Sequence, residues 1–159
     1  MQDTLVIERE HLINDIGIPG DEFMFFDGSG GFDTVATNKA VIQMLEYISK
    51  QSFFPDYLQL LPILAVDGSL GFVTDFESDP SLAGAKGNVF AKTGTKIEFV
   101  DGQLFLNGQA LGGYITTKSG KTLMFHLAVN NIPLGLDITS VQQVFQDQGA
   151  ITAIIWRDN

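Results

Sequence analysis

The strongest structural signal in the sequence is an Asp-Gly dipeptide that lies between two apolar runs. Ile97–Val100 precedes Asp101 and Gly102, and Gln103–Leu106 follows them. Asp-Gly favours a type I′ turn because glycine accepts a positive φ, so the sequence predicts a β-hairpin here. The segment from Lys96 to Gln109 that holds this hairpin lies between two other predicted strands.

Further strands are predicted on both sides of that hairpin. Residues 88–95 form an apolar segment before it, and residues 110–117 and 122–129 form a second hairpin after it. The second half of the chain is therefore expected to be an antiparallel sheet. Only a short strand, residues 22–26, is predicted in the first half.

Helical patterns flank the predicted sheet in the sequence. Residues 4–15 favour a helix that ends at Gly17, and Thr37 can cap a second one. Residues 53–79 indicate short helices and turns. A last helix, 139–156, carries one stripe that is apolar except for its fourth member: Val141, Val144, Phe145, Gln148, Ile151 and Ile155. The predicted fold class is α+β, an antiparallel sheet with packed helices, in a single domain over residues 1–159.

Gly149 is an unusual residue for the interior of the last predicted helix. Glycine in a helix costs about 1 kcal/mol relative to alanine. Its presence at this position therefore predicts that the helix packs closely on the sheet there.

Composition excludes several functional classes. Nine Lys and Arg against nineteen Asp and Glu give a net charge of −10, which disfavours nucleic-acid binding. The absence of cysteine removes disulfides and thiolate chemistry, and two histidines are too few for a His-rich zinc site. We expect no metal and no cofactor. No apolar run reaches the roughly 18 residues of a membrane span, and the first residues lack a signal-peptide pattern.

The charge is unevenly distributed along the chain. Residues 1–83 carry fourteen acids and three bases, whereas residues 84–159 carry five acids and six bases. Five of those bases lie between Lys86 and Lys121. Such a locally positive region can attract a small anion, although lysines on strand edges also serve to discourage aggregation.

Lys92, Thr93, Gly94 and Thr95 end the first predicted strand of the sheet. A lysine ammonium and a threonine hydroxyl on an edge strand can together hold a carboxylate. The glycine lets a ligand approach the backbone closely, and the N–H of Thr95 can donate to a developing oxyanion. Taken alone, the same residues also fit a strand end with a turn glycine.

The wider sequence resembles the serine-type D-alanyl-D-alanine carboxypeptidases, the low-molecular-mass class C penicillin-binding proteins. Four landmarks occur in the family's order, and the resemblance covers residues 20–131. They are Asp27-Gly28-Ser29-Gly30, then Leu61-Pro62 with Val66-Asp67-Gly68-Ser69-Leu70, then Lys92-Thr93-Gly94-Thr95, and finally Ala110–Thr117 with Gly120-Lys121 and Phe125–Asn130. The resemblance implies part of the β-lactamase and penicillin-binding transpeptidase-like fold.

The resemblance also implies roles for the third landmark. Lys92 and Thr93 would bind the terminal carboxylate of a peptidoglycan stem peptide or of a β-lactam, and Gly94 would keep the strand open. The Thr95 N–H would supply half of the oxyanion hole. The family's other two motifs, Ser-x-x-Lys and Ser-x-Asn, are absent from the sequence, and in the family both precede the first landmark. The chain therefore resembles the C-terminal part of such an enzyme, and we expect it to be inactive alone.

Other expectations follow from the same resemblance. The family implies a periplasmic or cell-surface location. In the family the sheet takes further strands beside the last hairpin strand, so Leu123–Val129 is expected to be an exposed apolar edge that favours a homodimer. Two alternatives remain: a non-catalytic relative that binds cell-wall peptides or a protein, and an unrelated α+β interaction domain with a chance Lys-Thr-Gly.

Overall fold

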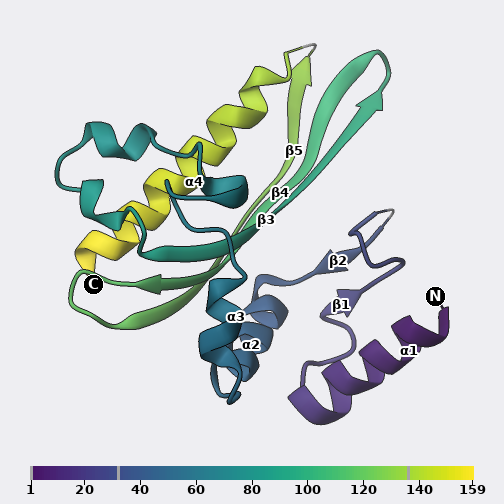
Figure 1. Ribbon diagram of the computed structural model, residues 1–159. Helices are drawn as coiled ribbons and strands as arrows, with labels where there is room; N and C mark the ends of the chain where they lie inside the picture. The colour runs from purple at the N-terminus through teal and green to yellow at the C-terminus, as the bar shows by residue number, and fades with distance from the viewer. Residues whose placement is uncertain (1, 32, 136) are drawn as a thin grey trace. The chain divides into compact units, whose positions relative to one another are not determined.

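The computed structural model describes residues 2–31, 33–135 and 137–159. The chain divides into two compact units, Met1–Phe54 and Pro55–Asn159, each with its own apolar core. Figure 1 shows the elements of both units. In the described part of the chain, no helix has the length and apolar character that a membrane span requires.

The first unit is mostly helical. Helix α1 (Gln2–His11) continues into a π-helical turn, Leu12–Ile16, which ends at Gly17 with a φ of 84°. Two short strands, β1 (Phe23–Met24) and β2 (Val35–Ala36), pair antiparallel. Helix α2 (Asn38–Ser49) begins where predicted, because the Thr37 hydroxyl accepts a hydrogen bond from the Ala40 N–H at 3.0 Å.

The second unit contains a three-stranded antiparallel sheet in the order β3-β4-β5. Helix α3 (Phe54–Gln59) begins at the boundary between the units and is followed by three short 3₁₀ turns, Gly68–Leu70, Asp75–Ser78 and Ala83–Ala85. The strands are β3 (Val89–Val100), β4 (Gln103–Thr116) and β5 (Thr122–Gly135), and helix α4 (Thr139–Asp158) closes the chain.

The predicted extra hairpin is a continuation of strands β3 and β4. Asp101 and Gly102 have φ angles of 50° and 80°, as a type I′ turn requires. The strand expected to end at Thr95 runs on to Val100, with a bulge between Lys96 and Ile97. At this bulge Asn107 of β4 has no partner residue on β3. The sequence does not reveal the bulge, and for this reason the hairpin strands were predicted as separate from the strands at residues 88–95 and 110–117.

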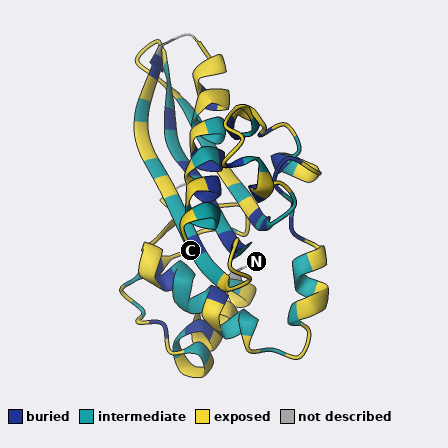
Figure 2. Cartoon of the chain, turned by 90° about the vertical axis from the view of Figure 1, so that its left-hand side faces the viewer, coloured by how far each residue is buried: buried dark blue, intermediate teal, exposed yellow. Residues whose placement is uncertain are grey.

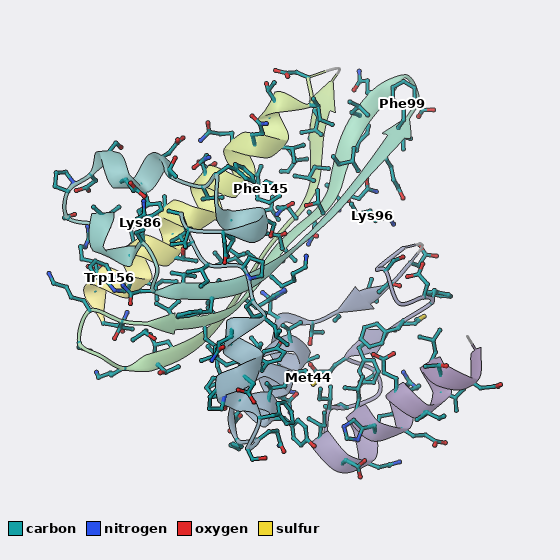
Figure 3. The ribbon with its side chains drawn as sticks, in the orientation of Figure 1. Met44, Lys86, Lys96, Phe99, Phe145 and Trp156 are labelled. Atoms are coloured by element: carbon teal, nitrogen blue, oxygen red, sulfur yellow. The ribbon has the colours of Figure 1, made fainter. Side chains whose placement is uncertain are left out.

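Helix α4 packs on the sheet and on the 3₁₀ turns of the same unit. Figure 2 colours parts of α4 and of the strands as buried. The core combines residues from turns, strands and helix: Leu64, Leu70, Val73, Phe76, Val89, Ala91, Leu111, Ile115 and Ala153. Phe145 of α4, labelled in Figure 3, packs against this core and contacts the Phe72 ring at 5.3 Å between centroids.

Gly149 of α4 lies at a close contact, as predicted, but the predicted partner, the sheet, is wrong. A Cβ atom added there would lie 2.3 Å from a γ-methyl group of Val73, which is fully buried. The neighbour is therefore the loop between two 3₁₀ turns rather than the sheet itself.

Replacing Gly149 with alanine should destabilise the protein. Alanine gains about 1 kcal/mol in helix propensity, but overpacking against a stiff, buried valine costs about 1–3 kcal/mol. We expect a net loss in the free energy of unfolding, measured by urea denaturation. Ser140→Ala at an exposed position of the same helix is the control and should change stability by less than about 0.5 kcal/mol. A Gly149→Ala variant more stable than wild type would contradict this packing.

Strand β5 lies at one side of the sheet and pairs with β4. Leu123–Val129, the predicted edge, lies within it. His126 sits in the middle of this strand, and its partial burial lowers the imidazole pKa, so the side chain is neutral at neutral pH. The strand therefore carries no histidine charge at that pH.

Candidate functional site

The Lys-Thr-Gly segment occupies the first half of β3, next to the core of the second unit. Val89 and Ala91 are fully buried, whereas Lys92 is exposed. This alternation anchors the strand through one face and leaves the lysine on the other.

The beginning of β3 is also held on the side away from β4. The Leu64 N–H donates to the Val89 carbonyl, and the Ala91 N–H donates to the Pro62 carbonyl, both at 3.0 Å. Backbone groups on an antiparallel strand alternate between its two sides. Since the register is regular up to Lys96, the Thr93 carbonyl and the Thr95 N–H face the same side as the Ala91 N–H.

The Lys92 ammonium reaches that side of the strand. Its Nζ atom donates to the Thr93 carbonyl oxygen at 2.6 Å. A cation and the Thr95 backbone N–H are therefore directed to the same edge of β3. A carboxylate or a developing oxyanion is the chemical group that such a pair of donors stabilises.

Gly94 leaves room beside the strand. A Cβ atom added there would lie 3.9 Å from the Ala110 side chain, which is ordinary van der Waals contact. Gly113 of β4 is different, because a Cβ there would lie 2.1 Å from the Phe90 carbonyl oxygen and 2.7 Å from Ala91 Cα. The close approach of β4 to the strand that carries the site thus depends on glycine at 113.

Three of the four sequence landmarks meet at β3. Pro62 of the second landmark pairs with the start of the strand, and the Thr93 hydroxyl donates to the Ser69 hydroxyl at 2.9 Å. The Asp67 carboxylate accepts from the Ile63 N–H at 2.8 Å, which fixes the loop between these residues. In the last landmark, Ala110–Ile115 lies in β4 and pairs with β3.

The first landmark lies in the other unit and forms a local turn. Asp27 Oδ1 accepts hydrogen bonds from the backbone N–H groups of Ser29 and Gly31, at 2.9 and 3.0 Å. These bonds hold the pKa of the Asp27 carboxyl below its usual range. Ser29 therefore takes part in shaping this loop.

Sequence reasoning did not predict three side-chain contacts around the site. Ser69 contacts Thr93, and the Thr95 hydroxyl donates to Gln109 Oε1 at 2.5 Å. Gln109 in turn contacts Gln148 of α4. Ser69 belongs to the second landmark, and Gln148 is a polar residue in an otherwise apolar helical stripe, but no sequence pattern pointed to Gln109.

A buried tyrosine lies on the opposite face of the sheet from the core. Tyr114 of β4, opposite Phe90, is 1 % exposed and makes an edge contact with the Tyr57 ring at 6.4 Å between centroids. Burial, with a smaller contribution from Tyr57, raises the pKa of the Tyr114 phenol above its ordinary value, so it stays protonated. Among residues 2–31, 33–135 and 137–159, no three His, Asp or Glu side chains are grouped to hold a metal ion.

Comparisons with known proteins give one family and one fold. The model of the D-Ala-D-Ala carboxypeptidase 3 (S13) family matches residues 2–150. The fold is similar to the crystal structure of penicillin binding protein 4 (dacB) from Haemophilus influenzae, with a TM-score of 0.69 and 24 % sequence identity. The match covers 97 % of this chain and 31 % of that one, so this chain spans about a third of that protein's length. No curated protein matches the sequence. The predicted fold class is confirmed.

Proposed function

Since the chain belongs to the D-Ala-D-Ala carboxypeptidase 3 (S13) family, we propose that it provides the carboxylate- and oxyanion-binding part of a serine-type D-Ala-D-Ala carboxypeptidase site. The observation that carries the proposal is the common edge of β3, to which both the Lys92 ammonium and the Thr95 N–H are directed. The substrate is the D-Ala-D-Ala end of a peptidoglycan stem peptide, and a β-lactam is its analogue.

Each residue of the segment has a separate task. The ammonium of Lys92 and the hydroxyl of Thr93 bind the terminal carboxylate, for which the Thr93 O–H must rotate from the Ser69 hydroxyl to the ligand. Gly94 lets the extended peptide lie along the strand, where it forms backbone hydrogen bonds with the edge. The Thr95 N–H donates to the oxygen that becomes negative when a serine attacks the peptide bond, and the second donor is the nucleophile's own N–H.

The family's nucleophile motif is not part of the 159 residues. The sequence holds no Ser-x-x-Lys and no Ser-x-Asn. Covalent acyl transfer requires an activated serine, because an unactivated hydroxyl is a weak nucleophile. We therefore propose that residues outside this sequence complete the site, and that the chain by itself binds without cleaving.

Incubation of this chain with a penicillin should leave its intact mass unchanged. The measurement is mass spectrometry of the denatured protein after incubation, which detects a covalent acyl-enzyme as one added penicillin. The control is the same chain incubated without the drug. A stoichiometric acyl adduct would show that a nucleophile is present among these residues.

A second candidate function is a non-catalytic relative that binds cell-wall peptides or a protein through the same strand. The missing nucleophile motifs favour it. The reading frame upstream of Met1 distinguishes the two: a Ser-x-x-Lys and a Ser-x-Asn there support the enzyme, and a true start codon supports the binding protein. For either candidate the proposed location is the periplasm or the cell surface, where peptidoglycan is found.

The outer side of β5 is the proposed contact for a second copy of the chain. Leu123–Val129 supplies an apolar strand that pairs on one side with β4. Such edges pair with other chains. Sedimentation velocity at tens of micromolar should show a dimer, and Ala128→Lys, at an exposed position of β5, should shift the distribution towards the monomer. A wild-type chain that sediments as a monomer would contradict this proposal.

A further inference from the structure

A buried chain of polar side chains connects helix α4 with the residue that follows the Lys-Thr-Gly segment. It consists of Thr95 on β3, Gln109 on β4 and Gln148 on α4. Gln109 is completely buried and Gln148 is 2 % exposed, whereas Thr95 is exposed at the edge strand. Buried amides must find hydrogen-bond partners, and these two find them in each other and in Thr95.

The direction of every bond in this chain is determined. Gln148 Nε2 donates to the Gln109 backbone carbonyl at 3.0 Å, and a carbonyl can only accept. The Gln148 amide oxygen is therefore left to accept from Gln109 Nε2, at 3.4 Å. Gln109 Oε1 then accepts from the Thr95 hydroxyl, at 2.5 Å. The amide of Gln148 thus determines how Gln109 is oriented, and Gln109 determines where the Thr95 hydroxyl donates.

The position of Thr95 explains why such an anchor matters. Thr95 pairs with Gln109 across the sheet and is followed at once by the bulge between Lys96 and Ile97, where the ladder is irregular. Figure 3 labels Lys96 at this place on β3. Bulges bend a strand and re-aim neighbouring groups. A side-chain bond to a buried amide holds the Thr95 residue next to this irregular point.

We propose that Gln109 and Gln148 are positioning residues, which hold Thr95 so that its backbone N–H is directed to the open edge of β3. The inference rests on the proposed function for the role of that N–H, but the hydrogen-bond chain itself does not. The Thr95 hydroxyl is used as a donor to Gln109, so the group that Thr95 offers to a ligand as a donor is its backbone N–H. Helix α4, through Gln148, thereby contributes to the geometry of a site that it does not line.

The test uses a double variant, Gln109→Leu with Gln148→Leu, so that no buried amide is left without its partner. Thr95→Val removes the hydroxyl from the other end of the chain. Gln142→Leu replaces an exposed glutamine of the same helix and is the matched control. Each is made in the full 159-residue chain, and its fold is checked by its amide spectrum.

The first readout requires no ligand. Three-bond couplings of Thr95 report its χ1 angle, and we expect a single rotamer in wild type and in Gln142→Leu but rotamer averaging in the double variant. If the double variant does not fold, Thr95→Val still tests the chain, because loss of the hydroxyl should shift the side-chain amide signals of Gln109 and Gln148. Thr95 couplings unchanged in a folded double variant, or Gln amide signals unchanged in Thr95→Val, would overturn the proposal.

The second readout is the Kd for N-acetyl-D-Ala-D-Ala. The double variant and Thr95→Val should each bind about 3- to 10-fold more weakly, as expected for one hydrogen bond. A triple variant that combines Thr95→Val with the two glutamine substitutions should bind no more weakly than either variant alone. The reason is that the double variant and Thr95→Val both act through the Thr95 hydroxyl. Additive losses would mean a general structural effect and would overturn the positioning role. If wild type itself does not bind, the proposed function is wrong, and the χ1 couplings alone decide whether the chain holds Thr95.

Discussion

Replacing Lys92 with methionine should weaken the binding of N-acetyl-D-Ala-D-Ala by about tenfold or more. Methionine keeps an unbranched side chain of similar length, with sulfur in place of one methylene group, and removes the ammonium. Hydrogen bonds to charged groups contribute about 1.5–3 kcal/mol, and the lower part of that range applies because Lys92 is exposed. The Kd is measured by amide-shift titration of the folded protein.

The control for this loss is Lys118→Met. Lys118 is also an exposed lysine of the second unit, but it lies in the turn between β4 and β5. The Lys118→Met substitution changes the net charge by the same amount as Lys92→Met, so a general electrostatic effect would weaken peptide binding equally in both variants. Equal Kd values for Lys92→Met and wild type would contradict the role assigned to the ammonium.

Replacing Gly113 with alanine should lower the free energy of unfolding by about 3 kcal/mol, at the upper end of the overpacking range. The added methyl group would lie 2.1 Å from the Phe90 carbonyl oxygen, and a backbone atom cannot move aside as a side chain can. Strand β3 must therefore shift away from β4 just before Lys92. We expect weaker peptide binding in addition to the loss of stability.

Gly108→Ala, on the same strand, separates this clash from a general effect of adding a methyl group. Its nearest neighbour would be Asn130 Oδ1 at 3.4 Å, which is close to normal contact. Urea denaturation of both variants gives the comparison. If Gly113→Ala were as stable as Gly108→Ala, the close approach of β3 and β4 at this position would be wrong.

The fold could be predicted from local signals where these were chemically specific. The Asp101–Gly102 turn and the Thr37 cap occur as expected, because each depends on a residue type with one favoured backbone role. Gly149 also identified a true close contact. The continuity of β3 was missed, since a bulge at Lys96 leaves the apolar pattern looking like two strands.

The site could be predicted only in part. The Lys92–Thr95 segment was proposed from the motif, but its partners come from distant parts of the chain. Ser69 is 24 residues from Thr93, and Gln109 is 39 residues from Gln148. Such pairs depend on how the 3₁₀ turns and α4 pack against the sheet, which local patterns do not specify.

The central claim is that the edge of β3 recognises a terminal D-Ala carboxylate. Its most direct test is a pair of amide-shift titrations of the wild-type chain, one with N-acetyl-D-Ala-D-Ala and one with the same peptide amidated at its C-terminus. The two ligands differ only in the carboxylate. We expect the free acid to shift the backbone signals of Lys92–Thr95 and the amide to bind at least tenfold more weakly, since it removes a charge-assisted contact. Equal binding of both peptides, or shifts confined to other residues, would contradict the account.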